Sequence, residues 1–421
     1  MFKRPPRSAF ILAAAAGLII SALLGCSYLM SAAPIEPVEP VLGAFEGDPR
    51  VDSPQAWRER RTPLLQAAFQ REIYGQLPDL GPARIAERRV LDLAELTPRA
   101  VAEEWSVVLG EGAHRFNLLI IAPREAARPL PVIEMQLFCG TRAALPGRPE
   151  EISDTLNPVF SGCNDTGLMN VAIHIILGRY INGPPIEDVI DRGYALAMFY
   201  PGDVVADDPE RAPAQLAELT GDPKPGALAV WATLFSSAYD VLAQDARFDA
   251  ERIAIWGHSR HGKAALLAGA FDHRFAAVIA HQSGRFGAAL TAPNRGERRD
   301  QIIDKYGYWF PPTLTDTSPM TVDQHMLLAL NAPTPVFVGN GEGDAWADPK
   351  STWRTLQGAD PVYRLLGSAG LQQPTPEEPT WRGDLVYWAR GGGHGVTTAD
   401  WRAFMAFLDA HLAADQGDAT Q

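Results

Sequence analysis

The sequence is poor in cysteine and has fewer basic than acidic residues, and these two features exclude a disulfide-held fold and argue against a nucleic acid partner. Three cysteines in 421 residues are too few for a fold held together by disulfides. The chain has 37 basic and 50 acidic residues and a net charge of −13, so we expect no nucleic acid partner, because phosphate binding needs a basic surface. The hydrophobic share of 46% excludes a disordered chain and suits one large α/β domain or two smaller ones.

The start of the chain predicts a targeting signal. Basic residues among the first seven precede an apolar run over 9–24, which ends in Leu23-Leu24-Gly25-Cys26. This pattern resembles a bacterial lipoprotein signal peptide over 1–25, whose cleavage leaves Cys26 as the lipidated N-terminus. An uncleaved membrane anchor is the alternative, although the run is short for a span of about 20 residues. We therefore expect an extracytoplasmic protein, on the periplasmic face of the outer membrane or the cell surface, held to the membrane by its N-terminal lipid only.

The residues after the signal differ in character from the rest. The segment over 26–50 is rich in proline, alanine and glutamate and predicts a flexible spacer. The two cysteines beyond it, Cys139 and Cys163, can form a disulfide in an oxidising compartment or remain buried thiols.

Short apolar runs alternate with helical patterns after the spacer. Several runs are apolar throughout, as expected for strands covered on both faces. The alternation predicts an α/β fold with a mostly parallel central sheet and helices on both faces. The expected strands are Phe116–Ile121, Pro131–Leu137, Tyr194–Tyr200, Ile253–Trp256, Phe275–His281, Pro335–Val338 and Leu385–Ala389. The expected helices are Pro185–Arg192, Leu228–Ala246, Lys263–Ala270 and Asp400–Ala413, with a further helical segment over 55–75 and loop-rich stretches over 140–185 and 290–325.

One strand runs directly into a serine and a helix. The segment reads Gly257-His258-Ser259-Arg260-His261-Gly262-Lys263, which is the nucleophile-elbow arrangement of α/β-hydrolases, with the second glycine one position later than in G-x-S-x-G. The helix N-terminus directs N–H groups at the space above Ser259, which suits an oxyanion. The alternative is that Ser259 only caps the helix. We interpret Ser259 as a nucleophile.

A serine nucleophile needs a base, and the base needs an acid. In α/β-hydrolases the chain order is serine, acid, histidine. His394 lies among glycines after the last expected strand and is the predicted base, the alternative being a surface-loop histidine. The acid is expected after the strand that ends near Val338, where Asp344 is our prediction and Glu342 the alternative. These features predict a single α/β-hydrolase domain over 51–415 and a C-terminal tail over 416–421.

The elbow also carries a more specific pattern. Gly257-x-Ser259-Arg260-x-Gly262-Lys263 resembles the G-C-S-R-x-G-K signature of the glucuronoyl esterases, a carbohydrate esterase family. The likeness extends from about Trp57 to Ala413. It includes Arg71-Glu-Ile-Tyr-Gly75, Asp249-Ala-Glu-Arg-Ile, Ser283-Gly284, Gly296-Glu297, Val322-Asp323-Gln324-His325, Asp344-Ala-Trp346-Ala-Asp348-Pro349 and Gly393-His394-Gly395.

The resemblance implies an activity and a substrate. Members have an α/β-hydrolase fold, use no metal, and need no cofactor. They cleave the ester that joins the carboxyl group of (4-O-methyl-)glucuronic acid on xylan to an alcohol, typically on lignin. The resemblance therefore implies a carbohydrate ester, such as a glucuronoxylan fragment, as the substrate of this chain.

The resemblance also implies roles for individual residues. Ser259 matches the nucleophile, His394 the base, and Arg260 the residue that stabilises the oxyanion. Three further residues, Lys263, Glu297 and Trp346, match positions that hold the uronic acid ring; each also has a plainer reading, as a solvated helix residue, a loop acid and a core aromatic. Trp309 and the run Asp323-Gln324-His325 match positions for which we expect architectural roles.

The sequence departs from the family pattern in two places. His258 replaces the common cysteine before the nucleophile and is expected to pack behind the elbow. Many members place the triad glutamate at the position of Gln282, and glutamine cannot carry the charge that stabilises an imidazolium. Other members use an acid after the later strand, which Asp344 matches, so Gln282 is expected to be a vestigial acid position.

The sequence thus predicts a serine esterase that hydrolyses glucuronic acid esters through Ser259, His394 and Asp344. Two alternatives remain open. One is an esterase for acetylated xylan or another carbohydrate ester that uses the same residues. The other is a lipid-anchored carbohydrate-binding protein with weak catalysis.

Overall fold

The computed structural model describes residues 38–413, apart from 94–95, 97, 127–128, 146, 158–162, 164–173, 222–224 and 292–295. The predicted signal peptide over 1–25, the predicted lipidation site Cys26, the first part of the predicted spacer and the tail over 416–421 lie outside the described residues. Among the described residues, no helix is both long enough and apolar enough to cross a membrane.

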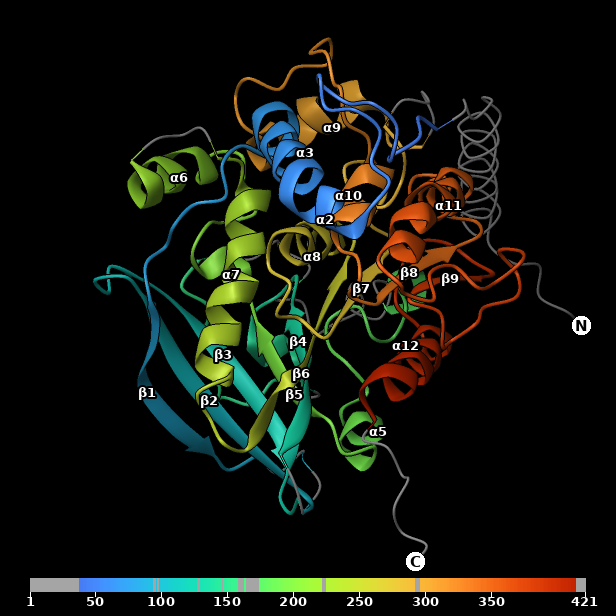
Figure 1. Ribbon diagram of the computed structural model, residues 1–421. Coiled ribbons are helices and arrows are strands. Elements are labelled where there is room, and N and C mark those ends of the chain that lie inside the picture. Colours follow the sequence, from blue (N-terminus) through green and yellow to red (C-terminus); the bar gives the residue numbers. More distant parts are fainter. Residues whose placement is uncertain are drawn as a thin grey trace, which may run out of the picture.

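The described strands form one sheet with the order β1-β2-β3-β5-β4-β6-β7-β8-β9 (Figure 1). The pairs from β1 to β5 are antiparallel, and every pair from β5 to β9 is parallel. The strands are β1 (Ala83–Leu91), β2 (Ala100–Leu109), β3 (His114–Pro123), β4 (Leu130–Gln136), β5 (Ala195–Phe199), β6 (Phe248–His258), β7 (Ala277–His281), β8 (Val336–Gly341) and β9 (Leu385–Arg390). The chain leaves β4 for β5 on one side and returns to β6 on the other, and ligands bind at the carboxyl ends of strands at such a reversal.

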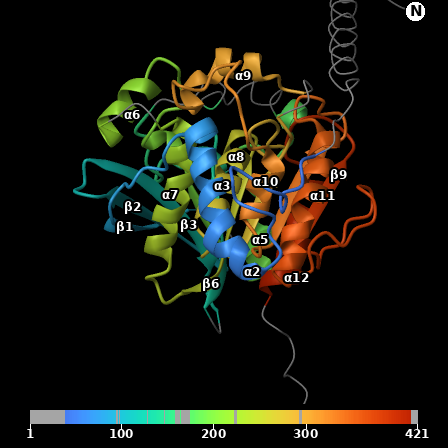
Figure 2. The same cartoon turned by 45° about the horizontal axis from the view of Figure 1, so that its top comes forward.

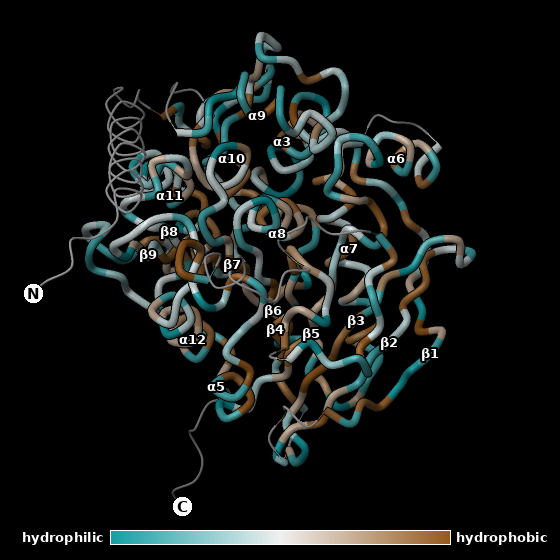
Figure 3. The backbone as a smooth tube through the Cα atoms, turned by 180° about the vertical axis from the view of Figure 1, so that it is seen from behind, coloured by the Kyte–Doolittle hydropathy of each residue, from teal (hydrophilic) through white to brown (hydrophobic). Residues whose placement is uncertain are grey.

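Every expected strand is present, and the central ones are strands because their side chains are buried on both faces. All residues of β4, β5, β7 and β8 are buried, which is the pattern that predicts a parallel sheet covered on both sides. The sequence did not predict β1 and β2. Most of β1 is exposed and rich in arginine and glutamate, so it lacks the apolar run that marks a buried strand; Figure 3 shows hydrophilic segments along this outer part of the sheet.

Helices cover both faces of the sheet, as expected. The larger hydrophobic core on one face includes residues of α3, α6, α7, α8, α9, α10 and α11, and the core on the other face includes residues of α5 and α12. The helices are α2 (Pro54–Ala56), α3 (Thr62–Phe69), α5 (Ile186–Asp191), α6 (Ala212–Thr220), α7 (Ala227–Leu242), α8 (Arg260–Phe271), α9 (Arg299–Tyr306), α10 (Gln324–Leu330), α11 (Pro349–Leu365) and α12 (Thr398–Leu412). This arrangement confirms the predicted α/β-hydrolase fold.

Four helices were not predicted from the sequence. Every residue of α10 is buried, so this helix shows no amphipathic pattern, and α11 contains Pro361, which is normally a helix breaker. The short helix α9 lies in the stretch over 290–325 that was expected to be loop-rich, and α6 lies in a part of the chain for which no element was expected. Both helices lie at the same end of the molecule in two views (Figures 1 and 2).

The predicted spacer ends earlier than residue 50. Val41 and Phe45 are buried against the domain. The buried guanidinium of Arg61 donates to the carbonyl groups of Val41, Gly43 and Pro49. Residues 38–50 are therefore part of the folded domain, because apolar side chains and a buried arginine hold them there; this corrects both the predicted spacer over 26–50 and the domain boundary at 51.

Candidate active site

Ser259 lies in a strained turn between β6 and α8. Its backbone angles are φ 54° and ψ −122°, a region that L-residues rarely adopt. Its N–H donates to the carbonyl oxygen of His281 at 2.8 Å. A Cβ atom on Gly257 would lie 2.0 Å from the carbonyl oxygen of His261, so the turn requires glycine there. The side chain is thus carried to the carboxyl edge of the sheet, where the first N–H groups of α8 have no partner within the helix.

His394 and Asp344 meet above the ends of β8 and β9. The carboxylate of Asp344 accepts a hydrogen bond from His394, with 2.7 Å between Nδ1 and Oδ2. Asp344 is 4% exposed, whereas the side chain of His394 is 30% exposed. The alternative acid, Glu342, is exposed and is not the carboxylate that bonds His394. The bond at Nδ1 leaves Nε2 of His394 as the nitrogen able to take a proton.

His258 connects the elbow to the His394 loop. Its ring is buried, and ring centroids lie 4.6 Å from His394 and 5.0 Å from His281. Burial lowers the pKa of His258 well below its ordinary value, so its ring is neutral and does not oppose a positive charge on His394. Among the described residues, the Ser259 hydroxyl makes no hydrogen bond to His394; such bonds are often long in ligand-free enzymes and shorten in the substrate complex.

The guanidinium of Arg260 is held by groups that the sequence did not reveal. It forms an ion pair with Asp207 and lies 4.7 Å from the ring of Trp309 and 5.6 Å from that of Phe138. Asp207 also accepts hydrogen bonds from Tyr308 Oη at 2.6 Å and Trp309 Nε1 at 3.0 Å. Burial acts to raise the pKa of Asp207, but the guanidinium charge and these bonds outweigh it and hold that pKa below its ordinary value. The guanidinium of Arg260 therefore keeps its positive charge and is held in one orientation.

Lys263 and Glu297 form a buried pair. Nζ of Lys263 donates to the carbonyl oxygens of Ser283 and Arg285 and, at 3.2 Å, to Oε2 of Glu297. Burial lowers the pKa of Lys263, and the negative charge of Glu297 partly opposes that shift. Because all three N–H donors are engaged, a sugar hydroxyl can bond Lys263 only by exchanging with one of these acceptors. Direct contact between Lys263 and substrate stays a prediction.

Trp346 is the most accessible of the residues predicted to hold a sugar. It is 42% exposed, and its carbonyl oxygen accepts from the N–H of Glu297 at 2.8 Å. The structure therefore brings Trp346 and Glu297 together and leaves an indole face open to solvent. This arrangement differs from the core position that was the alternative reading of Trp346.

The residues expected to be architectural do have structural contacts. Trp309 is buried. Asp323 caps α10 and also accepts from both the N–H and the hydroxyl of Thr291. Gln324 bonds the buried hydroxyl of Tyr74, and Nε2 of His325 lies 2.9 Å from the carbonyl oxygen of Glu39.

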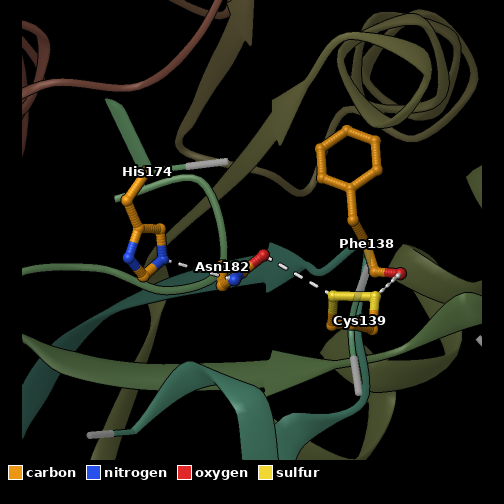
Figure 4. Close-up of a disulfide and its surroundings, with 5 residues drawn as sticks. Phe138, Cys139, His174 and Asn182 are labelled. Atoms are coloured by element: carbon orange, nitrogen blue, oxygen red, sulfur yellow. Dashed lines mark hydrogen bonds between the residues drawn. A yellow bond between two sulfur atoms is a disulfide. The ribbon is translucent and has the colours of Figure 1, made fainter. Parts of the chain in front are cut away.

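A disulfide lies beside the elbow. Cys139 and Cys163 are joined, and the side chain of Asn182 lies between Cys139 and His174 (Figure 4). Phe138, next to the disulfide, packs its ring 4.7 Å from that of His261. The disulfide therefore anchors the residue that flanks both Arg260 and the start of α8.

The described part of the chain has no cluster of three or more histidine, cysteine, aspartate or glutamate residues with the arrangement of a metal site.

Comparisons with known proteins give a consistent result. The family model for fungal glucuronyl esterases matches residues 173–367. A prokaryotic protein, carbohydrate esterase MZ0003, is 32% identical over 381 residues, which cover 86% of this chain and 87% of that one. The 4-O-methyl-glucuronoyl methylesterase 1 of Phanerochaete chrysosporium is 30% identical over 157 residues, 34% of this chain and 33% of that one.

Two solved structures resemble nearly the whole chain. A glucuronoyl esterase from Solibacter usitatus superposes with a TM-score of 0.77 at 29% identity, covering 90% of this chain and 99% of that one. A promiscuous CE15 esterase from a marine bacterial metagenome gives a TM-score of 0.74 at 30% identity, covering 91% and 99%.

Proposed function

This chain belongs to the glucuronoyl esterase family of carboxylic ester hydrolases, and from that premise we propose that Ser259, His394 and Asp344 hydrolyse esters of (4-O-methyl-)glucuronic acid. The observation that carries the proposal is the 2.7 Å hydrogen bond between His394 and the buried carboxylate of Asp344. A carboxylate in this position fixes the tautomer of the imidazole and stabilises the imidazolium. The fungal relatives named 4-O-methyl-glucuronoyl methylesterases support the acid half of the substrate.

The proposed reaction is a two-step acyl transfer. Oγ of Ser259 attacks the ester carbonyl carbon while Nε2 of His394 takes its proton. The tetrahedral intermediate then collapses, the bond to the alcohol oxygen breaks, and His394 gives its proton to the leaving alcohol. Water attacks the acyl-enzyme in the same way, returns a proton to Ser259 through His394, and releases glucuronic acid.

Two groups of donors are available for the oxyanion. One is the set of first N–H groups of α8, which starts directly after Ser259, and the other is the guanidinium of Arg260, which Asp207 holds in place. One well-placed donor of this kind contributes about 3 kcal/mol to the stability of the transition state. The anchoring of Arg260 among aromatic rings supports this role, because a fixed charge needs no reorganisation during the reaction.

We assign the acid side of the substrate to the exposed ring of Trp346 and to Glu297, which is buried next to it. An exposed indole offers a flat face for the C–H groups of a sugar ring, and a carboxylate accepts from sugar hydroxyls. Lys263 supports Glu297 through the buried ion pair. We propose glucuronoxylan fragments esterified to lignin alcohols as the natural substrates.

A panel of esters tests the proposed function. We expect kcat/KM for the benzyl and methyl esters of glucuronic acid to exceed that for acetylated xylan at least 10-fold, and Ser259→Ala to be inactive on all of them. Faster release of acetate would favour the alternative carbohydrate esterase. Binding of glucuronoxylan without hydrolysis of any ester would favour the carbohydrate-binding protein.

We also propose that lipid on Cys26 holds the enzyme outside the cytoplasm. The signal-like sequence before Cys26 supports this location, as does the disulfide between Cys139 and Cys163, because disulfides persist in oxidising compartments. In a bacterium grown with labelled palmitate, the wild-type protein is expected to carry the label and Cys26→Ala to carry none. Absence of the label from the wild-type protein would contradict the lipid anchor.

A further inference from the structure

The amide of Gln282 bridges the two peptide groups on either side of His394. Oε1 accepts from the N–H of Gly395 at 2.6 Å, and Nε2 donates to the carbonyl oxygen of Gly393 at 3.2 Å. These two groups belong to the peptide bonds that precede and follow His394. Gln282 is 1% exposed, so water does not compete with either bond.

The backbone around Gln282 fixes where this amide lies. The N–H of Gln282 donates to Gly339 at 2.7 Å, which extends the pairing of β7 with β8 by one residue. Its φ of 49° lies in the left-handed region that non-glycine residues rarely adopt. A Cβ atom on Gly341 would lie 2.5 Å from the carbonyl oxygen of Gly393 and 2.9 Å from Nε2 of Gln282. Glycine at the end of β8 therefore lets the loop and the amide meet.

A second residue supports the same loop from its own strand. Arg390, the last residue of β9, donates to the carbonyl oxygens of Gly391, Gly393 and Gly395. Its Nε is in turn bonded to the buried carboxylate of Asp400 at 2.7 Å. Arg390 only donates, so Gln282 is the side chain that accepts from the N–H of Gly395.

We propose that Gln282 is a positioning residue for His394, and that this position now requires an amide instead of a carboxylate. The inference rests on the proposed function of His394. An amide presents a donor and an acceptor side by side, which matches the two peptide groups. A carboxylate presents two acceptors, so one of its oxygens would face the carbonyl oxygen of Gly393. Asp344 already bonds Nδ1 of His394, which leaves no role for an acid at position 282.

The test compares Gln282→Ala, Gln282→Met and Gln282→Glu on benzyl glucuronate. We expect each to lower kcat by about 10- to 100-fold, because small errors in placing a catalytic group have effects of this size, while KM changes less than threefold. Gln282→Met keeps the side-chain volume, so a loss in this variant reports the hydrogen bonds and not a cavity. Gln372→Glu, an exposed glutamine made acidic, is the control and should match the wild type.

The double variant Asp344→Asn with Gln282→Glu distinguishes a positioning role for Gln282 from the hypothesis that position 282 is a vestigial site of the triad acid. We expect it to be no more active than Asp344→Asn alone. Restored activity in the double variant, or wild-type activity in Gln282→Glu, would overturn the inference and identify position 282 as a working acid site.

Hydrogen exchange gives a readout that needs no ester. In Gln282→Met, peptides covering residues 391–395 should take up deuterium faster than in the wild type, because the N–H of Gly395 loses its acceptor. Unchanged exchange in a folded variant would contradict the inference. If the wild-type protein hydrolyses no glucuronate ester, the proposed function fails, but the exchange experiment still decides whether Gln282 holds this loop.

Discussion

His394→Ala is expected to lower kcat for benzyl glucuronate by about 10,000-fold or more, with little change in KM. Without the imidazole no group takes the proton of Ser259 or returns it to the leaving alcohol, and losing the base of a triad has an effect of this size or larger. Because His394 is not assigned to either half of the substrate, binding should survive. Steady-state kinetics that resolve kcat from KM give the measurement.

The matched control is His273→Ala. His273 is exposed, lies two residues after the C-terminal end of α8, and is not part of the site, so this variant should retain wild-type kinetics. Wild-type activity in His394→Ala would show that His394 is not the general base. Equal losses in both variants would point to general damage and not to catalysis.

Asp344→Asn is expected to lower kcat by about 1,000- to 10,000-fold. The asparagine side chain fills the same space but carries no charge to stabilise the imidazolium, and it also permits the wrong tautomer of His394. KM should change little, because the carboxylate is bonded to His394 and to the N–H of Ala347, not assigned to the substrate.

Glu342→Gln is the control for this prediction, because Glu342 lies in the same loop and is exposed. We expect its kcat to remain within twofold of the wild type. Full activity in Asp344→Asn together with a large loss in Glu342→Gln would exchange the roles of the two acids. Full activity in both would rule out an acid from this loop.

The strands that could be predicted from the sequence are mainly those that are buried on both faces, because burial on both faces requires a continuous apolar run. The strands β4, β5, β7, β8 and β9 are apolar runs that lie close to their expected positions, and β6 begins five residues before its expected start at Ile253. Most of β1 is exposed, β2 has two glutamates in the middle of the strand, and every residue of α10 is buried, so none of the three shows the pattern that identifies its type. Tertiary packing determines the secondary structure of these segments, and the local sequence pattern does not show that packing.

Some residues of the candidate site could likewise be predicted from the sequence, and others could not. The elbow at Ser259 could be predicted because strand, serine, glycine and helix are contiguous, and the glycine-rich loop around His394 is equally local. Asp344 and Glu342 lie in one loop, and the hydrogen bond to His394 that distinguishes Asp344 is visible only in the structure. The ion-pair partner of Arg260 is Asp207, which in turn accepts from Tyr308, and no spacing rule links these distant positions.

Gln282 is the clearest example of a residue whose role could not be predicted from the sequence. By sequence it reads as a lost acid, since glutamine replaces a family glutamate. Its bonds to Gly393 and Gly395 join positions more than 110 residues apart, and they exist only because three strand ends meet at one edge of the sheet. The physical role of the amide depends on that meeting and could not be inferred from composition or spacing.

Labelling with a fluorophosphonate probe, followed by peptide mass spectrometry, tests the central claim most directly. The account predicts one modified residue, Ser259, with labelling at least 100-fold slower in His394→Ala and in Asp344→Asn. Labelling at another serine, or an unlabelled Ser259 in a protein that still binds glucuronoxylan, would contradict the claim that this chain is a serine esterase.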